Sequence, residues 1–293
     1  MSDLIFPLTQ SEEFERTCKK VEIPVQRFSD SAGSCLVQSR RFPIIGAINL
    51  ISRGPVQRGN AGVEALLTDV RRSTRGPLFV NPPAGFSSNL GLKIAREAKL
   101  AIIDIEAPGV MRQKLHQKWR NQLRKAENAP LRVLNQPLEA RRHRWFLEAE
   151  QAQQKVRKYR AHPTGFLLAY AAVNEGQARV FTAMDGLDPV AAMLVLKHGR
   201  MATYQAGIIT HAGKAYCAHN LLLWSIMNAL ERKGVRHLDL GRSDLSNGLR
   251  RFKLGAGARE DVLPGTYWAR GWGKHFSSKA NFDTLPFNRC PEA

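Results

Sequence analysis

The sequence has 293 residues, of which 43% are hydrophobic and 24% are charged; this composition excludes a disordered chain and allows one large or two ordinary domains. Lys and Arg total 44 against 25 Asp and Glu, and the net charge of +19 indicates a polyanionic partner: a nucleic acid, a nucleotide-bearing cofactor or an anionic membrane surface. A generally basic proteome is the alternative explanation for this charge. No apolar run approaches the roughly 20 residues that a helix needs to span a membrane, which excludes a transmembrane helix.

The cysteines and the N-terminal residues bear on the compartment. Cys18, Cys35, Cys217 and Cys290 are widely separated and form no CxxC pair, so neither a disulfide framework nor a zinc site is expected. The first residues lack the basic flank, the apolar region and the cleavage site of a signal peptide. We therefore expect a cytoplasmic protein with no metal site.

The first hundred residues alternate between short helical and strand patterns. Residues 11–20 predict a helix with Ser11 as its N-cap, and the apolar spacing of residues 60–71 predicts a second helix. The apolar runs 44–51 and 100–105 have the length and composition of strands.

Residues 111–128 predict a basic amphipathic helix that ends near Pro130. Its apolar face holds Met111, Leu115, Trp119, Leu123 and Ala126. The cations of its other faces are Arg112, Lys114, Lys118, Arg120, Arg124 and Lys125, which form the best candidate for a polyanion-binding track. A solvated basic face is the alternative. We place the join between two halves directly after this helix, which gives domains 1–128 and 129–271.

The second half repeats the mixed α/β pattern. Helices are predicted over residues 138–159 and 219–233, the latter followed by Gly234 in a position typical of a helix end. Strands are predicted over residues 178–183, 190–197, 200–209 and 235–240, the first two joined by the turn dipeptide Asp185-Gly186.

A family resemblance rests on the order of motifs between residues 202 and 257. Tyr204 lies on a strand, and a helix then begins near Asn220 and ends at Gly234. A strand with the turn residues Asp239 and Gly241 comes next, and the pair Phe252-Lys253 follows it. This order resembles the Fem-type branch of the GNAT acyltransferase superfamily. The triplet 53–55 (RGP) and the helical residues 118–126 are similar to further parts of that family.

The resemblance implies an enzyme, an amide-forming acyl- or aminoacyltransferase. It implies an α/β fold of two tandem GNAT-like halves that share a central cleft, with the tail 272–293 packing back on the first half. Within this frame Lys253 is expected near the donor ester or thioester, where its ammonium would stabilise the oxyanion, and Phe252 is expected to line the same pocket. Without the motif, Lys253 would be interpreted as a surface lysine.

Two further side chains are candidate catalytic residues. The phenol of Tyr204 can hydrogen-bond the acceptor or the tetrahedral intermediate, and a half-buried strand tyrosine is the alternative. Asp239 lies in an apolar strand, where an unpaired carboxylate is costly. It is expected to pair with Arg242, to cap the turn at Gly241 or to act on the amine proton.

Donor binding is expected where the helix over residues 219–233 begins. The backbone N–H groups and the positive dipole end near His219 and Asn220 suit a phosphate. Arg157 lies where Fem-type enzymes often contact substrate phosphates. No histidine, serine or cysteine arrangement of a nucleophilic triad is visible in the sequence.

The sequence does not decide whether the acyl donor is acyl-CoA or aminoacyl-tRNA. Residues 204–222 lack the Arg/Gln-Gly-x-Gly/Ala signature of simple acetyl-CoA enzymes, and they contain only Gly207 and Gly213. We expect no tightly bound cofactor, with acyl-CoA or aminoacyl-tRNA as co-substrate and an amine acceptor on a small metabolite, a peptide or an envelope precursor. The alternatives are a nucleic-acid-binding protein without catalysis, and a peripheral membrane protein that uses the basic helix to act on a lipid amine.

Overall fold

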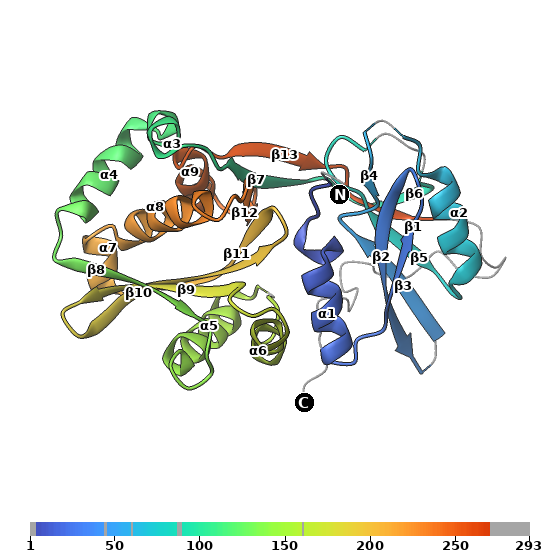
Figure 1. Ribbon diagram of the computed structural model, residues 1–293, viewed down its shortest axis with the longest axis horizontal. Helices are drawn as coiled ribbons and strands as arrows, with labels where there is room; N and C mark the ends of the chain where they lie inside the picture. The colour runs from blue at the N-terminus through green and yellow to red at the C-terminus, as the bar shows by residue number, and fades with distance from the viewer. Residues whose placement is uncertain (1–3, 44–45, 60, 87–89, 160, 270–293) are drawn as a thin grey trace. The chain divides into compact units, whose positions relative to one another are not determined.

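The computed structural model describes residues 4–43, 46–59, 61–86, 90–159 and 161–269 (Figure 1). Its contacts divide the chain into two units, Met1–Ala98 with Val262–Ala293, and Lys99–Asp261. The second unit is thus one continuous stretch of chain, inserted into the first.

The first unit contains a mixed seven-stranded sheet in the order β1-β2-β3-β5-β14-β6, with β4 paired to β2. The strands are β1 Val25–Ser29, β2 Gly33–Phe42, β3 Gly46–Ser52, β4 Val56–Gln57, β5 Leu78–Asn81, β6 Leu92–Ala95 and β14 Thr266–Trp268. Strands β3 and β5 are parallel, whereas β14 runs antiparallel to both of its neighbours. The predicted strand 44–51 corresponds to β3, although residues 44 and 45 lie outside the described residues.

The helices of this unit are η1 Leu8–Gln10, α1 Glu12–Lys20 and α2 Glu64–Ser73. The predicted N-cap of the first α-helix is confirmed, because the Ser11 hydroxyl accepts a hydrogen bond from the Phe14 N–H. The helix predicted over residues 60–71 corresponds to α2, with residue 60 outside the described residues. The buried side chains of its face pack with β2 and β5 in one core that includes Leu66, Val70, Cys35, Val37, Leu78 and Val80.

The second unit contains another seven-stranded sheet, in the order β13-β7-β12-β11-β10-β9-β8. Its strands are β7 Ala98–Asp104, β8 Leu131–Pro137, β9 Ala178–Asp185, β10 Asp188–His198, β11 Met201–Ile209, β12 His237–Arg242 and β13 Arg259–Leu263. Its helices are α3 Pro108–Lys114, α4 Gln117–Glu127, α5 Arg144–Arg157, α6 Thr164–Val173, α7 His211–Ala215, α8 Ala218–Glu231 and α9 Asn247–Gly255. In Figure 1, α4, α8 and α9 lie on one face of this sheet, and α5 and α6 lie on the other.

The predicted basic helix over residues 111–128 is two helices. Leu115 has an extended backbone (ψ 135°) and ends α3, and His116 is the N-cap of α4. The apolar face was nevertheless predicted correctly, since all five of its residues, from Met111 to Ala126, are buried, and all except Ala126 belong to the main core of this unit.

Two neighbouring strands separate near the middle of this sheet. β11 and β12 are parallel and pair only over Met201–His237, Ala202–Leu238 and Thr203–Asp239, although β11 continues to Ile209 and β12 to Arg242. The β10–β11 register shifts at this point, where Tyr204 lies opposite Val195 and Ala206 opposite Leu194. Beyond Thr203 and Asp239 the two strands are no longer paired, and the unpaired end of β11 leads into α7 and then α8.

The division between the two units differs from the predicted join after residue 128. β7 is a member of the second sheet, and α4 packs against α8, so residues 99–128 belong to the second unit. The predicted position of the tail 272–293 lies outside the described residues, as does Cys290. No helix in the described part of the chain is both long and apolar enough to cross a membrane.

Candidate active site

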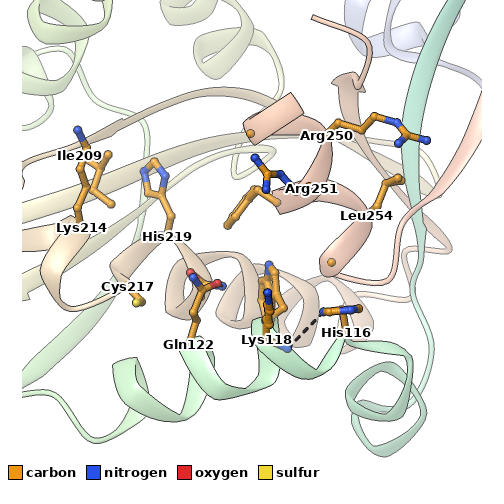
Figure 2. Close-up of a pocket in the computed structure, with 15 residues that line it drawn as sticks. His116, Lys118, Gln122, Ile209, Lys214, Cys217, His219, Arg250, Arg251 and Leu254 are labelled. Carbon is orange, nitrogen blue, oxygen red and sulfur yellow. Dashed lines mark hydrogen bonds between the residues drawn. The ribbon is translucent and has the colours of Figure 1, made fainter. Parts of the chain in front are cut away.

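A cavity of about 730 Å³ lies within the second unit, at the end of β11 that is not paired with β12 (Figure 2). Five elements supply its walls: α4, the end of β11, α7, the start of α8, and α9. The lining residues are His116, Lys118, Trp119, Gln122, Ile209, Lys214, Cys217, His219, Asn220, Gly248, Arg250, Arg251, Phe252, Leu254 and Gly255.

The break between α3 and α4 forms one wall of this pocket. Nδ1 of His116 accepts a hydrogen bond from the Lys118 N–H (3.3 Å), so the imidazole caps α4. The backbone N–H of the same histidine donates to the carbonyl of Gly255 (2.9 Å), which connects the start of α4 to the end of α9. The two helices that face each other across the pocket are therefore joined at one end.

Aromatic rings form the apolar part of the lining. The Phe252 ring lies 6.1 Å from the Trp119 ring and 6.4 Å from the His219 ring, measured between centroids. Gly255 lies flat against the indole, because a Cβ at this position would be 3.0 Å from Cδ1 of Trp119. These contacts provide a surface on which a base or an acyl chain can pack.

The start of α8 contributes polar groups. Cys217 is the N-cap in the left-handed conformation (φ +57°), and the side chain of Asn220 donates to Oε1 of Gln122 on α4 (3.4 Å). His219 projects from the first turn, and its Nε2 lies 2.9 Å from the carbonyl oxygen of Ile208. The predicted donor-binding residues His219, Asn220 and Phe252 therefore meet in one pocket.

The pocket is electropositive. Among the described residues that line it, none is acidic and four are Lys or Arg. Arg250 donates two hydrogen bonds to the Glu260 carboxylate (2.9 and 2.7 Å), and these bonds, together with one from the Ser243 hydroxyl (2.7 Å), lower the pKa of Glu260 to about 2. Within the described residues no ion pair neutralises Lys118, Lys214 or Arg251, so these three cations and the positive end of α8 are available to an anion.

Lys253 and Asp239 lie outside the lining of this pocket. The Lys253 side chain is 5% exposed, and its Nζ donates to the carbonyl of Arg242 (2.7 Å) at the end of β12. Burial lowers the pKa of Lys253 to about 8, while the nearby charges of Asp239 and Asp244 act in the opposite direction. Oδ1 of Asp239 accepts a hydrogen bond from the Gly241 N–H (2.7 Å), which is the turn-capping role among the three expected for it.

Tyr204 also lies outside the lining, in a polar cluster where α5 meets β11. A Cβ on Gly207 would be 2.2 Å from the Tyr204 hydroxyl, so the ring lies against the strand backbone, and burial raises its pKa. Next to it the carboxylate of Glu150 accepts hydrogen bonds from the Tyr159 hydroxyl (2.6 Å) and from Gln153 (3.1 Å). Burial raises the pKa of Glu150.

Arg157 is exposed at the end of α5 and does not line the pocket. Its positive charge acts on Glu150, Tyr159 and Tyr204 of the polar cluster and on His219 of the pocket, and it lowers the pKa of each.

The predicted polyanion track is shorter than expected. Arg112 is paired with Glu127 through two hydrogen bonds of 2.8 Å and lies over the Trp224 ring, and Lys114 is paired with Glu106. Lys118, Arg124 and Lys125 are exposed on α4, and Arg120 is half-buried. The separation of α3 from α4 thus divides the predicted track, and its α4 part adjoins the pocket.

Several lining residues were not among the predicted ones: His116, Gln122, Lys214, Arg250 and Arg251. Two of them, Arg250 and Arg251, are sequence neighbours of Lys253, and a helix predicted over residues 247–255 would have placed them near the same motif. The others come together only through the fold. In the described part of the chain no group of three or more His, Cys, Asp and Glu side chains is arranged to hold a metal ion.

Residues 113–260 match the model of the family described as "Acetyltransferase (GNAT) domain". The chain belongs to this GNAT family. The matched region includes every residue that lines the pocket, so the pocket lies within the family's own domain. No curated protein sequence matches the chain.

Solved structures show the same fold at low sequence identity. FemX superposes with a TM-score of 0.71 at 12% identity, covering 90% of this chain and 92% of FemX. The C-terminal domain (DUF2156) of a putative lysylphosphatidylglycerol synthetase from Agrobacterium fabrum superposes with a TM-score of 0.59 at 16% identity, covering 89% of each chain. For L-PGS from Bacillus licheniformis the TM-score is 0.51 at 13% identity, and the match covers 90% of this chain and 93% of that one.

The GNAT family and the resemblance to its Fem-type branch are therefore confirmed, as is the mixed α/β fold of two GNAT-like halves. The chain is therefore an acyltransferase, an enzyme that moves an acyl group from a donor to an acceptor.

Proposed function

We propose that this GNAT protein forms amide bonds by moving an aminoacyl group from aminoacyl-tRNA to an amine acceptor. The observation that carries the proposal is the position of the electropositive pocket beside the exposed cations of α4. The 3′-terminal nucleotides of the donor would enter the pocket, and the preceding phosphates would follow Lys118, Arg124 and Lys125 along the helix.

The lining suits the end of a charged tRNA. Lys118, Lys214 and Arg251 supply cations for phosphates, and the Phe252 and Trp119 rings supply a face on which a base can stack. A volume of about 730 Å³ falls in the range usual for small-ligand pockets, roughly 300–1,000 Å³.

A tRNA donor accounts for the charge better than coenzyme A does. Coenzyme A carries all of its phosphates at one end and needs only a short cationic site. Arg124 and Lys125 lie about two turns of helix beyond Lys118, outside the pocket lining, where only a longer polyanion can reach them. The segment before α8 also lacks the glycine-rich signature of simple acetyl-CoA enzymes and forms the short helix α7 instead.

The transfer itself needs an oriented ester, stabilisation of the oxyanion and a route for the amine proton. The predicted catalytic roles of Lys253, Tyr204 and Asp239 stay predictions, since each lies outside the pocket lining. The acceptor is an amine, whether of a small metabolite, a peptide or an envelope precursor. Because aminoacyl-tRNA is a cytoplasmic co-substrate, the proposal requires the cytoplasmic location expected from the sequence.

A transfer assay tests the proposal. The purified protein is incubated with tRNA carrying a radiolabelled amino acid and, separately, with radiolabelled acyl-CoA, each with a panel of amines. We expect label to move from tRNA into an amide. The double variant Lys118→Glu/Arg124→Glu should slow this transfer by at least roughly 10-fold at subsaturating tRNA, because two phosphate contacts become repulsive.

The matched control is Arg232→Glu/Lys233→Glu, which reverses two exposed charges at the opposite end of α8. It should transfer at the wild-type rate. Transfer from acyl-CoA alone would replace the proposed donor, and tight tRNA binding without transfer from either donor would refute the amide-forming activity.

A further inference from the structure

His219 is held in one orientation at the pocket wall. It lies in the first turn of α8, and its side chain extends toward the end of β11, where Nε2 is 2.9 Å from the Ile208 carbonyl oxygen. In the view of Figure 2 the imidazole lies between Lys214 and Arg251. The Phe252 ring lies 6.4 Å from the imidazole, measured between centroids.

This hydrogen bond determines the tautomer of the ring. A carbonyl oxygen only accepts, so Nε2 must carry the proton and donate it to Ile208. In the neutral imidazole the second nitrogen, Nδ1, is then the basic atom. The strand end thus supplies the orienting partner that a histidine base requires.

The surroundings keep the ring neutral. Burial lowers the pKa of His219, the hydrogen bond to Ile208 opposes this shift, and the charges of Arg157 on α5 and Lys214 on α7 lower the pKa further. The other titratable and charged groups that line the same pocket are His116, Lys118, Cys217, Arg250 and Arg251. None of these is acidic, so no carboxylate of the lining favours the imidazolium at neutral pH.

We propose that Nδ1 of His219 accepts the proton that the acceptor amine loses when it attacks the donor ester. The amine nitrogen forms a bond to the carbonyl carbon and gives its proton to Nδ1. When the tetrahedral intermediate collapses, the bond from carbon to the ribose oxygen breaks, and His219 returns the proton to that oxygen. The products are an amide and a tRNA with a free hydroxyl, and the histidine is neutral again.

The other titratable groups near the pocket suit this task less well. The ammonium of Lys253 is directed to the Arg242 carbonyl, and Glu150 is occupied by donors from Tyr159 and Gln153. Nδ1 of His116 accepts the cap hydrogen bond of α4. Of these residues only His219 combines a place in the lining with a hydrogen bond that leaves its basic nitrogen for another partner.

The inference rests on the proposed transfer from tRNA, and its test compares His219→Gln with His211→Gln. Glutamine can still donate to the Ile208 carbonyl but cannot accept a proton at neutral pH. His211 is exposed on the neighbouring helix α7 and does not line the pocket, so its variant should behave as the wild type. For each protein kcat/KM is measured from about pH 5 to pH 9, and the Kd for uncharged tRNA is measured at one pH.

We expect the wild type and His211→Gln to lose activity as the pH falls through the lowered pKa of His219, below the ordinary value of 6.5. In His219→Gln the rate should fall about 10²- to 10⁴-fold and this acidic limb should disappear, while the Kd for tRNA stays the same. The ionisation of the acceptor amine affects all three proteins equally. Added imidazole should raise the rate of His219→Ala.

The failures of the two proposals are distinguishable. An inactive wild type with every donor overturns both the transfer activity and the role of His219. An active wild type with a His219→Gln rate within about threefold, or with the acidic limb retained, overturns only the role of His219. A weakened Kd for tRNA in His219→Gln with an unchanged pH profile would also overturn it, because the histidine would then only hold the donor.

Discussion

Phe252 and Lys253 are adjacent in sequence, but their side chains point to different sides of α9. Successive residues of a helix point about 100° apart, so Phe252 reaches the pocket while Lys253 reaches the end of β12. Lys253 there satisfies the Arg242 carbonyl beside the Gly241 turn, which Asp239 caps. The motif that carried the family resemblance therefore places a pocket residue next to a buried ammonium that points to another side of the helix.

The buried ammonium of Lys253 has a measurable consequence for stability. Its pKa is about 8 in the folded chain against an ordinary 10.5, so between these values the unfolded chain binds more protons and stability rises with pH. In Lys253→Met this rise should be absent. The difference in unfolding free energy between wild type and variant should grow, in favour of the wild type, by on the order of 3 kcal/mol between about pH 8 and pH 10.5. Urea unfolding across this range measures it, and parallel pH dependences would contradict the assignment.

At the scale of elements, the break between α3 and α4 shapes the pocket. A continuous helix over residues 111–128 would leave His116 inside a helix, with its backbone N–H directed along the helix axis. The extended Leu115 instead turns this N–H to the Gly255 carbonyl and allows the imidazole to cap α4. The non-helical backbone at Leu115 and His116 thus places Lys118 and Trp119 opposite α9.

The cap predicts the effect of substitutions at His116. Asparagine can also accept from an N–H of the first turn, so His116→Asn should keep the wild-type free energy of unfolding or exceed it. His116→Ala removes the acceptor and should lower that free energy by about 1 kcal/mol, a usual loss for an N-cap. Urea unfolding at neutral pH compares the two. Equal stability of the alanine and asparagine variants would show that the interaction between the imidazole and the Lys118 N–H does not act as a cap.

The elements that the sequence predicts well are those with many buried apolar residues. α8 has eight buried residues, and the strands β9 and β10 are largely buried, so their apolar patterns were visible in the sequence. α9 was missed because its one buried residue is Lys253, so the helix has no stripe of buried apolar residues to detect. The pocket residues that were predicted are His219, Asn220 and Phe252, which belong to the family motif, and Lys118, which belongs to the predicted basic helix. Lys214 and Gln122 are brought there by packing between distant elements, which local sequence patterns do not contain.

At the scale of the whole molecule, the charge of +19 acts over a longer range than any single hydrogen bond or ion pair. Much of it lies outside the pocket, so binding of any polyanion should have a large component that depends on salt and not on sequence. The local question is how many phosphates the exposed face of α4 binds.

The salt dependence of tRNA binding answers this question. A plot of log Kd against log salt concentration becomes shallower by roughly 0.7–0.9 for each phosphate that the protein no longer neutralises. The neutral variant Lys118→Gln/Arg124→Gln should therefore reduce the slope by about 1.5. Arg232→Gln/Lys233→Gln is the charge-matched control and should keep the wild-type slope. Equal slopes in both variants would assign binding to the general charge of the protein and not to α4.

The insertion of one unit into the other sets an order of events during synthesis. β14, at Thr266–Trp268, is the strand that joins β5 to β6 in the first sheet. A nascent chain leaving the ribosome therefore presents β5 and β6 with unpaired edges until all of Lys99–Asp261 has emerged. The second unit is continuous in the chain. When Asp261 emerges, all strands of its sheet are therefore present except the last residues of β13. The unit made first is thus the one completed last.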